Sequence, residues 1–226
     1  MTIYFDTLPS GIKVLTEEIP TIESVSVGVW IGVGSRNENK KESGIAHFLE
    51  HMAFKGTEKR SALQIAESIE NVGGFINAYT SKEITCYYAK ILKDDLPLAV
   101  DILSDIISNS LYKKEEIERE KGVIIQEIGQ IRDTPDEFIF ELLQKEAFSD
   151  TELGRSILGT VDNVSSFKRD DFIQFTKKNY FSNRIVVCGA GNLKHQELCT
   201  LAEKFQPVEG DDHKLEPFGR IMDGRP

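Results

Sequence analysis

Apolar residues recur at every second position in several short segments, a period that predicts half-buried β-strands. In 24–31, four β-branched residues alternate with Ser, Gly or Trp. Segments 3–8 and 12–17 lie on either side of a Pro-Ser-Gly turn sequence, which favours a β-hairpin. Three later segments also have the composition of strands: 75–79, 84–92 and 184–190.

Other segments repeat apolar residues at three- and four-residue intervals, as α-helices with one buried face do. Capping residues mark several helix starts. Ser43 is the expected N-cap of the first helix, and Ser61 with Gln64 forms a capping box. The Thr-Pro-Asp-Glu sequence at 134–137 is a second capping box, with Pro at the first helical position. Besides the helix after Ser43, helices are predicted over 62–72, 95–107, 113–131, 135–147 and 195–205.

This mixture of hairpins, adjacent strands and helices indicates an α+β fold with a mostly antiparallel sheet flanked by helices. The 226 residues are 40% hydrophobic, enough for one large domain or two small ones. No internal repeat is evident. Residues 206–226 are rich in Pro, Gly and Asp and are predicted to be a linker or tail that follows a metal-binding α+β domain over 1–205.

The segment His47-Phe48-Leu49-Glu50-His51 carries the most specific chemistry in the chain. On a helix, His47, Glu50 and His51 share one face because they lie three and four residues apart. Two imidazoles one turn apart can bind one zinc ion, and the carboxylate beside them can accept a proton from an attacking water. The H-x-x-E-H order is a signature of zinc peptidases of the inverzincin type. We therefore predict His47 and His51 as metal ligands and Glu50 as the general base.

A catalytic zinc site needs a third protein ligand, and the helix predicted over 113–131 offers two candidates. Glu120 and Glu127 fall on the same stripe as the isoleucines that should face the core. Carboxylates on an inward face are costly unless a positive charge meets them. The alternative is a helix with a broad polar face, since other glutamates surround this stripe. Next to a histidine pair that lacks a ligand, zinc as the counter-charge is the better interpretation.

The other histidines and the cysteines show no comparable pattern. His195 and His213 are interpreted as solvated surface residues, because no ligand spacing is apparent around them. Cys86, Cys188 and Cys199 are scattered and lack C-x-x-C spacing, which indicates reduced thiols in a reducing compartment. A purely structural zinc site is disfavoured, because such sites are closed by four ligands and are rich in cysteine.

The sequence resembles the M16 (pitrilysin-type) zinc metallopeptidases, especially the mitochondrial processing peptidase branch and its bacterial relatives. The resemblance covers nearly the whole chain and is carried by 44–57, 77–81 and 118–127. Members of that branch have two related α+β halves that enclose a chamber, and this chain corresponds to the metal-bearing half. The expected partners are peptide substrates and a second M16-type half, preferably in the same chain, otherwise in a partner chain or a dimer.

The resemblance also implies roles for individual residues. It makes Glu127 the third zinc ligand and Glu120 a residue that supports the site from behind the ligands. Asn77, Ala78 and Tyr79 match the strand that binds the substrate backbone in that family. On the residues alone, this segment is an ordinary end of a strand.

We therefore expect a zinc-dependent metalloendopeptidase that cleaves peptides or presequence-like segments and is poorly active as one half. The alternative is a non-catalytic substrate-binding or structural subunit, which the intact motif disfavours. The net charge of −10 argues against nucleic acid and anionic membranes as partners. The sequence contains no run of 18 apolar residues, so we expect no membrane span. The N-terminus shows no secretory signal, so the bacterial cytoplasm is the expected location, with the mitochondrial matrix as the alternative.

Overall fold

A six-stranded β-sheet runs through the centre of the structure, a computed structural model that describes residues 2–149 and 151–206. The strand order is β1-β2-β6-β3-β5-β4. Every neighbouring pair is antiparallel except β2 and β6, which are parallel. The predicted α+β fold with a mostly antiparallel sheet is confirmed. The strands are β1 (Ile3–Thr7), β2 (Lys13–Glu18), β3 (Ser24–Ile31), β4 (Phe75–Thr80), β5 (Thr85–Leu92) and β6 (Ile185–Gly191).

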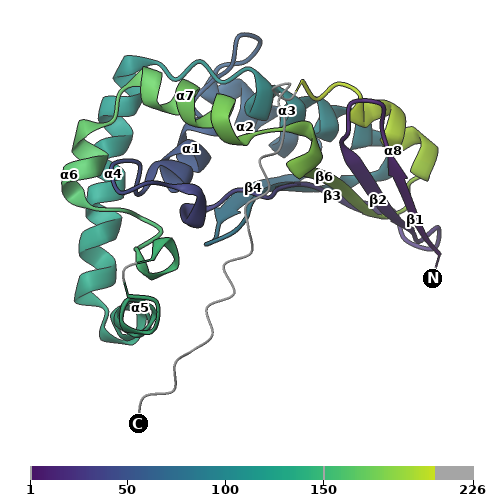
Figure 1. Ribbon diagram of the computed structural model, residues 1–226. Helices are drawn as coiled ribbons and strands as arrows, with labels where there is room; N and C mark the ends of the chain where they lie inside the picture. The colour runs from purple at the N-terminus through teal and green to yellow at the C-terminus, as the bar shows by residue number, and fades with distance from the viewer. Residues whose placement is uncertain (1, 150, 207–226) are drawn as a thin grey trace.

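The helices cover one face of this sheet and extend beyond one of its ends (Figure 1). Helix α3 packs on β3 and β5, and α8 packs on β2. Helices α4 and α5 lie past the β4 end of the sheet, where α1 contacts both α4 and β4. The α-helices are α1 (Ile45–Ala53), α2 (Ala62–Glu70), α3 (Leu96–Ser108), α4 (Lys114–Asp133), α5 (Pro135–Ala147), α6 (Val161–Ser166), α7 (Arg169–Asn179) and α8 (His195–Ala202). Short 3-10 helices span Ser35–Asn37, Lys93–Asp95, Glu152–Gly154 and Ser182–Arg184.

The core lies between the sheet and these helices and follows from the sequence pattern. Val25, Val29 and Ile31 of β3 are fully buried beneath α3, as the period of two predicts. Phe48 of α1 packs edge-on against Phe172 of α7, with ring centroids 5.0 Å apart. Fully burying one such side chain contributes about 1.5–3 kcal/mol, so these contacts anchor α1 firmly.

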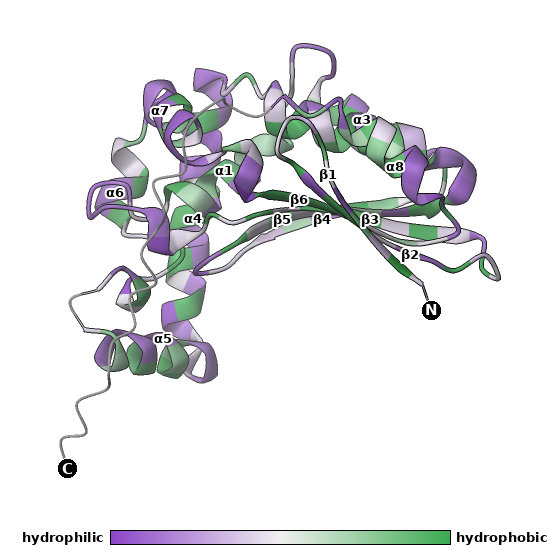
Figure 2. Cartoon of the chain, turned by 45° about the vertical axis from the view of Figure 1, so that its right-hand side comes forward, coloured by the Kyte–Doolittle hydropathy of each residue, from purple (hydrophilic) through white to green (hydrophobic). Residues whose placement is uncertain are grey.

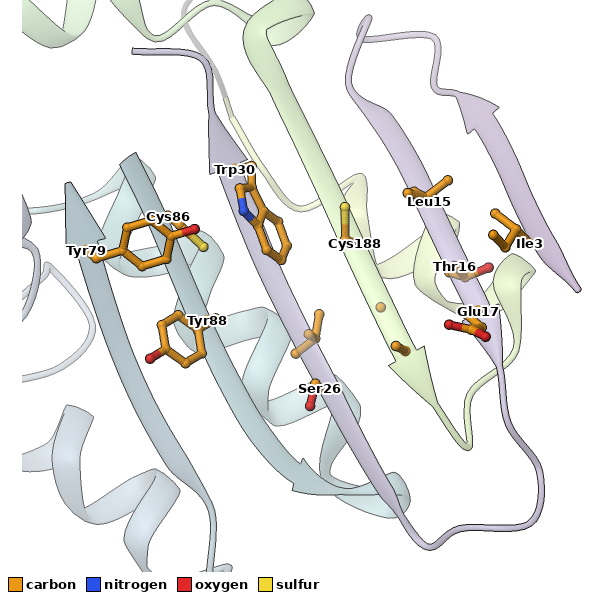
Figure 3. A pocket seen from close by; sticks show the side chains of 13 residues that line it. Ile3, Leu15, Thr16, Glu17, Ser26, Trp30, Tyr79, Cys86, Tyr88 and Cys188 are labelled. Carbon is orange, nitrogen blue, oxygen red and sulfur yellow. The ribbon is translucent and has the colours of Figure 1, made fainter. Parts of the chain in front are cut away.

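The opposite face of the sheet carries no packed helix within the described residues (Figure 2). It holds a shallow depression of about 410 Å³, lined by residues from every strand. Figure 3 shows Trp30, Tyr79, Tyr88 and Cys188 on this surface. Trp30 lies over Gly28, where an added Cβ would come within 2.7 Å of the indole ring. The sheet thus presents a largely apolar wall on the side away from its helices.

One predicted helix cap is wrong, and another is confirmed in position only. Gly44, not Ser43, is the N-cap of α1 and has a φ of 99°, a left-handed conformation that glycine adopts without strain. Thr134 is the N-cap of α5 and Pro135 begins the helix, as predicted, but the Thr134 hydroxyl donates to the carbonyl of Gln130 in α4, so the side-chain hydrogen bond of the predicted capping box is absent. Because α5 begins directly after α4 ends, the preceding helix competes for this hydroxyl.

The remaining element boundaries follow the predictions closely, and the capping box of Ser61 and Gln64 is present. Helices α6 and α7 were not predicted. Strand β6 pairs with both β2 and β3, so its segment belongs to the same sheet as the N-terminal strands. Of the predicted linker over 206–226, only residue 206 lies within the described residues, and the domain boundary stays a prediction.

Candidate metal centre

Helix α1 presents the polar residues of the H-x-x-E-H motif on one side and its apolar residues on the other. Phe48 and Leu49 are buried in the core. The rings of His47 and His51 have centroids 4.6 Å apart at an interplanar angle of 63°. Their side chains are 13% and 18% exposed, so both imidazoles lie in a mostly enclosed space that solvent still reaches.

Helix α4 brings a carboxylate to both imidazoles. Oε2 of Glu127 is 3.8 Å from Nε2 of His47 and 3.6 Å from Nε2 of His51. One ligand atom from each of the three residues lies within 4.8 Å of the others. The structure therefore brings together the two histidines of the motif and Glu127, although Glu127 is 76 residues (127 − 51) beyond His51.

Glu120, seven residues before Glu127 on the same stripe of α4, lies behind the histidine pair. Its Oε2 accepts a hydrogen bond from Nδ1 of His51 at 3.0 Å, and its Oε1 pairs with Nζ of Lys55 at 2.7 Å. The carboxylate is only 4% exposed. A hydrogen bond at Nδ1 leaves the lone pair of His51 on Nε2, the atom that faces Glu127.

The three converging groups fit a zinc ion. Zinc bonds of about 2.0–2.2 Å place tetrahedral ligand atoms about 3.3–3.6 Å apart. The observed separations of 3.6 and 3.8 Å come within a few tenths of an ångström of this range. Two imidazoles and one carboxylate make three protein ligands and leave a fourth position for solvent or substrate. Catalytic zinc sites have this arrangement, whereas structural sites are closed by four protein ligands.

Burial shifts the pKa of two residues in this centre, His47 and Glu50. It lowers the pKa of His47 to about 3, with a smaller contribution from the neighbouring His51, so the imidazole is neutral as a metal ligand must be. Nδ1 of His47 and Oε2 of Glu50 are buried and have no hydrogen-bond partner among the described residues. Burial raises the pKa of Glu50, Glu127 adds to this, and Thr80 and His51 oppose it in part.

Glu38 holds the start of α1, a role that was not predicted. Its Oε2 accepts the N–H of Gly44 and its Oε1 that of Ala46, both at 2.9 Å. Burial raises the pKa of Glu38 to about 8, although these two N–H donors oppose the shift. Arg155 donates to the backbone carbonyl of Glu38 and fixes it from the other side. These contacts position the helix that carries both histidines.

Strand β4 passes beside α1 and has one unpaired edge, because it is the last strand of the sheet. Asn77 and Tyr79 are exposed and Ala78 is nearly buried. The N–H of Ala78 donates to Oδ1 of Asn77 at 2.8 Å. This amide is satisfied by a neighbouring side chain and can be released for another acceptor. The segment predicted to bind substrate therefore borders the metal centre.

The prediction for His195 is wrong, whereas His213 lies outside the described residues. The side chain of His195 is only 11% exposed and contacts Asp6, Thr16 and Cys199. The sequence does carry a signal for this cluster, because His195 and Cys199 are four residues apart on α8 and therefore share one face.

The three cysteines are free thiols, as predicted. No helix within the described residues is long and apolar enough to cross a membrane.

The fold and the arrangement of the side chains in this centre are those expected of a peptidase that carries the inverted H-x-x-E-H motif. The family model described as Insulinase (Peptidase family M16) matches residues 13–161, and the one described as Peptidase M16 inactive domain matches residues 166–217. The chain belongs to peptidase family M16.

Curated relatives agree with this assignment. The chain is 47% identical over 198 residues to the mitochondrial-processing peptidase subunit beta of Saccharomyces cerevisiae, with 88% of this chain and 43% of that protein covered. It is 48% identical over 196 residues to the human subunit of that name, with 87% and 40% covered. An uncharacterized zinc protease of Streptomyces coelicolor is 43% identical over 197 residues, with 87% and 43% covered. The chain thus spans about two fifths of the length of these relatives, whose names support a metallopeptidase role.

Solved structures show the same fold at low sequence identity. A protease from Helicobacter pylori superposes with a TM-score of 0.87 at 24% identity, covering 93% of this chain and 52% of that one. A peptidase M16 inactive domain from Pseudomonas fluorescens superposes with a TM-score of 0.84 at 15% identity, covering 93% and 53%. In both cases this chain corresponds to about half of the larger protein.

Proposed function

We propose that this chain is the metal-bearing half of a zinc metalloendopeptidase that cleaves peptides, including presequence-like segments. The observation that carries the proposal is the convergence of His47, His51 and Glu127 beside Glu50, on two helices held against one core. The relatives named as a zinc protease and a processing peptidase support zinc as the metal and peptides as the substrate class.

In this proposal Nε2 of His47, Nε2 of His51 and the Glu127 carboxylate hold the metal. When bound, zinc supplies a Lewis acid that polarises the scissile carbonyl. Glu50 accepts a proton at its carboxylate from the attacking water and delivers it to the leaving amine. The partly buried site raises the pKa of Glu50, which brings its proton affinity closer to neutral pH and suits both transfers.

Glu120 and Lys55 keep the histidine pair ready for this role. The carboxylate of Glu120 holds the proton of His51 at Nδ1, away from the metal side. Lys55 balances the charge of this buried carboxylate at 2.7 Å. The imidazole of His51 is thereby held in one orientation and one tautomer before any metal binds.

The free edge of β4 is the proposed binding place for the substrate backbone. An extended peptide can add to an edge strand through main-chain hydrogen bonds. The N–H of Ala78 becomes available when the side chain of Asn77 turns away, and Thr80 lies next to Glu50 at the end of the same strand. A peptide in this position would pass the metal centre. The net charge of −10 favours basic peptides.

The uncovered face of the sheet is the proposed wall of a chamber that a second M16-type half closes. Its depression is apolar and open, and the relatives are more than twice as long as the matched region. We infer that the second half lies in the same chain or in a partner chain and supplies the facing wall. The proposed compartment is the bacterial cytoplasm or the mitochondrial matrix, since the matched relatives include a bacterial protein and mitochondrial-processing peptidase subunits.

Glu50→Gln in the full-length protein tests the proposed role of Glu50. The amide keeps the size of the side chain but cannot accept the proton, so peptidase activity should fall at least about 10²-fold while zinc content is unchanged. Glu67→Gln on the exposed surface of α2 is the matched control and should behave as wild type. Activity of Glu50→Gln within tenfold of wild type would show another base. Wild-type protein that binds peptides without cleaving them would favour the alternative of a substrate-binding subunit.

A further inference from the structure

A second cluster of potential metal ligands lies where β1 meets α8. Asp6 comes from β1, and His195 and Cys199 come from α8. One oxygen, one nitrogen and one sulfur atom from these residues lie within 4.8 Å of one another. Figure 1 places β1 and α8 at the end of the sheet away from α1 and α4. The proposed peptidase site uses none of these residues.

Local structure explains why the three side chains meet. His195 and Cys199 are separated by four residues on α8 and therefore lie one above the other on the same face. Tyr4 and Asp6 are alternate residues of β1 and point to the same side of the sheet. The ring of Tyr4 stacks on that of His195, with centroids 5.5 Å apart and an interplanar angle of 25°. This side of β1 therefore faces α8.

Both neighbours approach the same nitrogen of the His195 ring. Nε2 lies 3.1 Å from Oδ2 of Asp6 and 3.5 Å from Sγ of Cys199. A nucleophilic Cys-His-Asp relay needs the thiol on one ring nitrogen and the carboxylate on the other, so this cluster is not such a relay. A neutral imidazole offers either one proton or one lone pair at Nε2 and cannot serve both neighbours well. A cation between the three atoms would be bound by all of them.

The separations match those around a tetrahedral zinc ion. Zinc bonds of about 2.0–2.2 Å to N and O and about 2.3 Å to S place the N and O atoms about 3.4 Å apart and the N and S atoms about 3.6 Å apart. The observed values of 3.1 and 3.5 Å are close to these. Nδ1 of His195 lies 2.8 Å from Oγ1 of the buried Thr16, which can hold the ring proton on that side. Nε2 is then left with its lone pair toward the other two residues.

We propose that Asp6, His195 and Cys199 form a second metal site, for zinc or a similar thiophilic divalent cation. On binding, the thiol of Cys199 releases its proton to solvent as the sulfur–metal bond forms, and no oxidation state changes. The side chain of Asp6 is 61% exposed, so solvent can take the fourth position. A cation here ties the edge strand β1, whose residues are all exposed, to α8.

Cobalt(II) substitution tests this site separately from the peptidase centre. A thiolate ligand gives Co(II) a charge-transfer band in the near ultraviolet, and the ligands proposed at His47, His51 and Glu127 include no sulfur. The metal-free protein titrated with Co(II) should therefore develop this band and bind a second equivalent. Cys199→Ser should abolish the band and the second equivalent, while Cys188→Ser, a thiol outside the cluster, should keep both. His47→Ala should lose the other equivalent and retain the band.

Asp6→Asn changes an exposed side chain, so this variant should fold like the wild type. It should weaken Co(II) binding at this site at least about tenfold, which appears as a shift of the titration midpoint of the band. Absence of the band in wild type, or its survival in Cys199→Ser, would overturn the proposal. Because the band reports thiolate alone, this outcome leaves the proposed peptidase function untouched.

Discussion

Glu120→Gln tests how far the proposed zinc centre depends on a residue that does not reach the metal. Glu120 is almost fully buried and divides its two oxygens between Nδ1 of His51 and Nζ of Lys55. Glutamine has the same shape, but only one of its two terminal atoms is an acceptor. If its NH₂ group faces His51, the imidazole proton is favoured on Nε2, where it blocks metal binding. If the NH₂ group faces Lys55, the ammonium loses its counter-charge.

The expected loss can be estimated from these two outcomes. Removing the partner that orients a metal-binding histidine typically weakens metal affinity 10–100-fold, or about 1.4–2.7 kcal/mol. Both orientations of the amide forfeit one charge-assisted hydrogen bond, so we expect a value within this range. The zinc ligands themselves are unchanged, and the site should still fill at high zinc concentration.

Competition with a zinc chelator at fixed pH measures this affinity directly. A matched control is Glu118→Gln on the same helix, which also removes one negative charge but lies at an exposed position, 57% exposed and paired with Lys121. The Asp6 site is removed from both measurements by carrying Cys199→Ser in the background. An affinity of Glu120→Gln within twofold of the control would refute the role assigned to this hydrogen bond.

Glu38 has a native pKa of about 8, above the ordinary value of 4.5, so its contribution to stability is present at pH 4.5 and is lost as the pH rises toward 8. Urea unfolding should therefore show a wild-type stability that falls more steeply between pH 5 and pH 8 than that of Glu38→Gln, and parallel slopes would contradict the burial argument. Residues 1–226 alone should bind zinc but cleave a fluorogenic peptide at least about 10²-fold more slowly than the full-length protein, because they lack the proposed second half that would position the peptide from the other side. Adding the second half should restore turnover, and comparable specific activities at equal zinc content would show that the site is complete within this chain.

The parts of the site that were predictable from sequence rest on local periodicity. His47, Glu50 and His51 share a face because their spacing is helical, whatever the rest of the fold does. The stripe on α4 likewise placed Glu120 and Glu127 together on one side. Choosing Glu127 over Glu120 as the ligand depended on the family resemblance, since spacing alone does not say which carboxylate meets the histidines.

Contacts between distant segments were not predictable in this way. Glu38 caps α1 from six residues before Gly44, through a loop whose path no periodic pattern describes. The interpretation of His195 failed for the same reason, because Asp6 reaches it from β1, 189 residues away. In both cases the polar side chain is held by the tertiary fold, whereas sequence patterns report only neighbours along one element.

Anomalous diffraction above and below the zinc absorption edge, on crystals of zinc-loaded protein, tests the central claim most directly. The account predicts a zinc peak about 2.0–2.2 Å from Nε2 of His47, Nε2 of His51 and a carboxylate oxygen of Glu127, with the carboxylate of Glu50 beside it and not bound. A Glu127 carboxylate far from both imidazoles, or zinc held at this centre by other residues, would contradict the account.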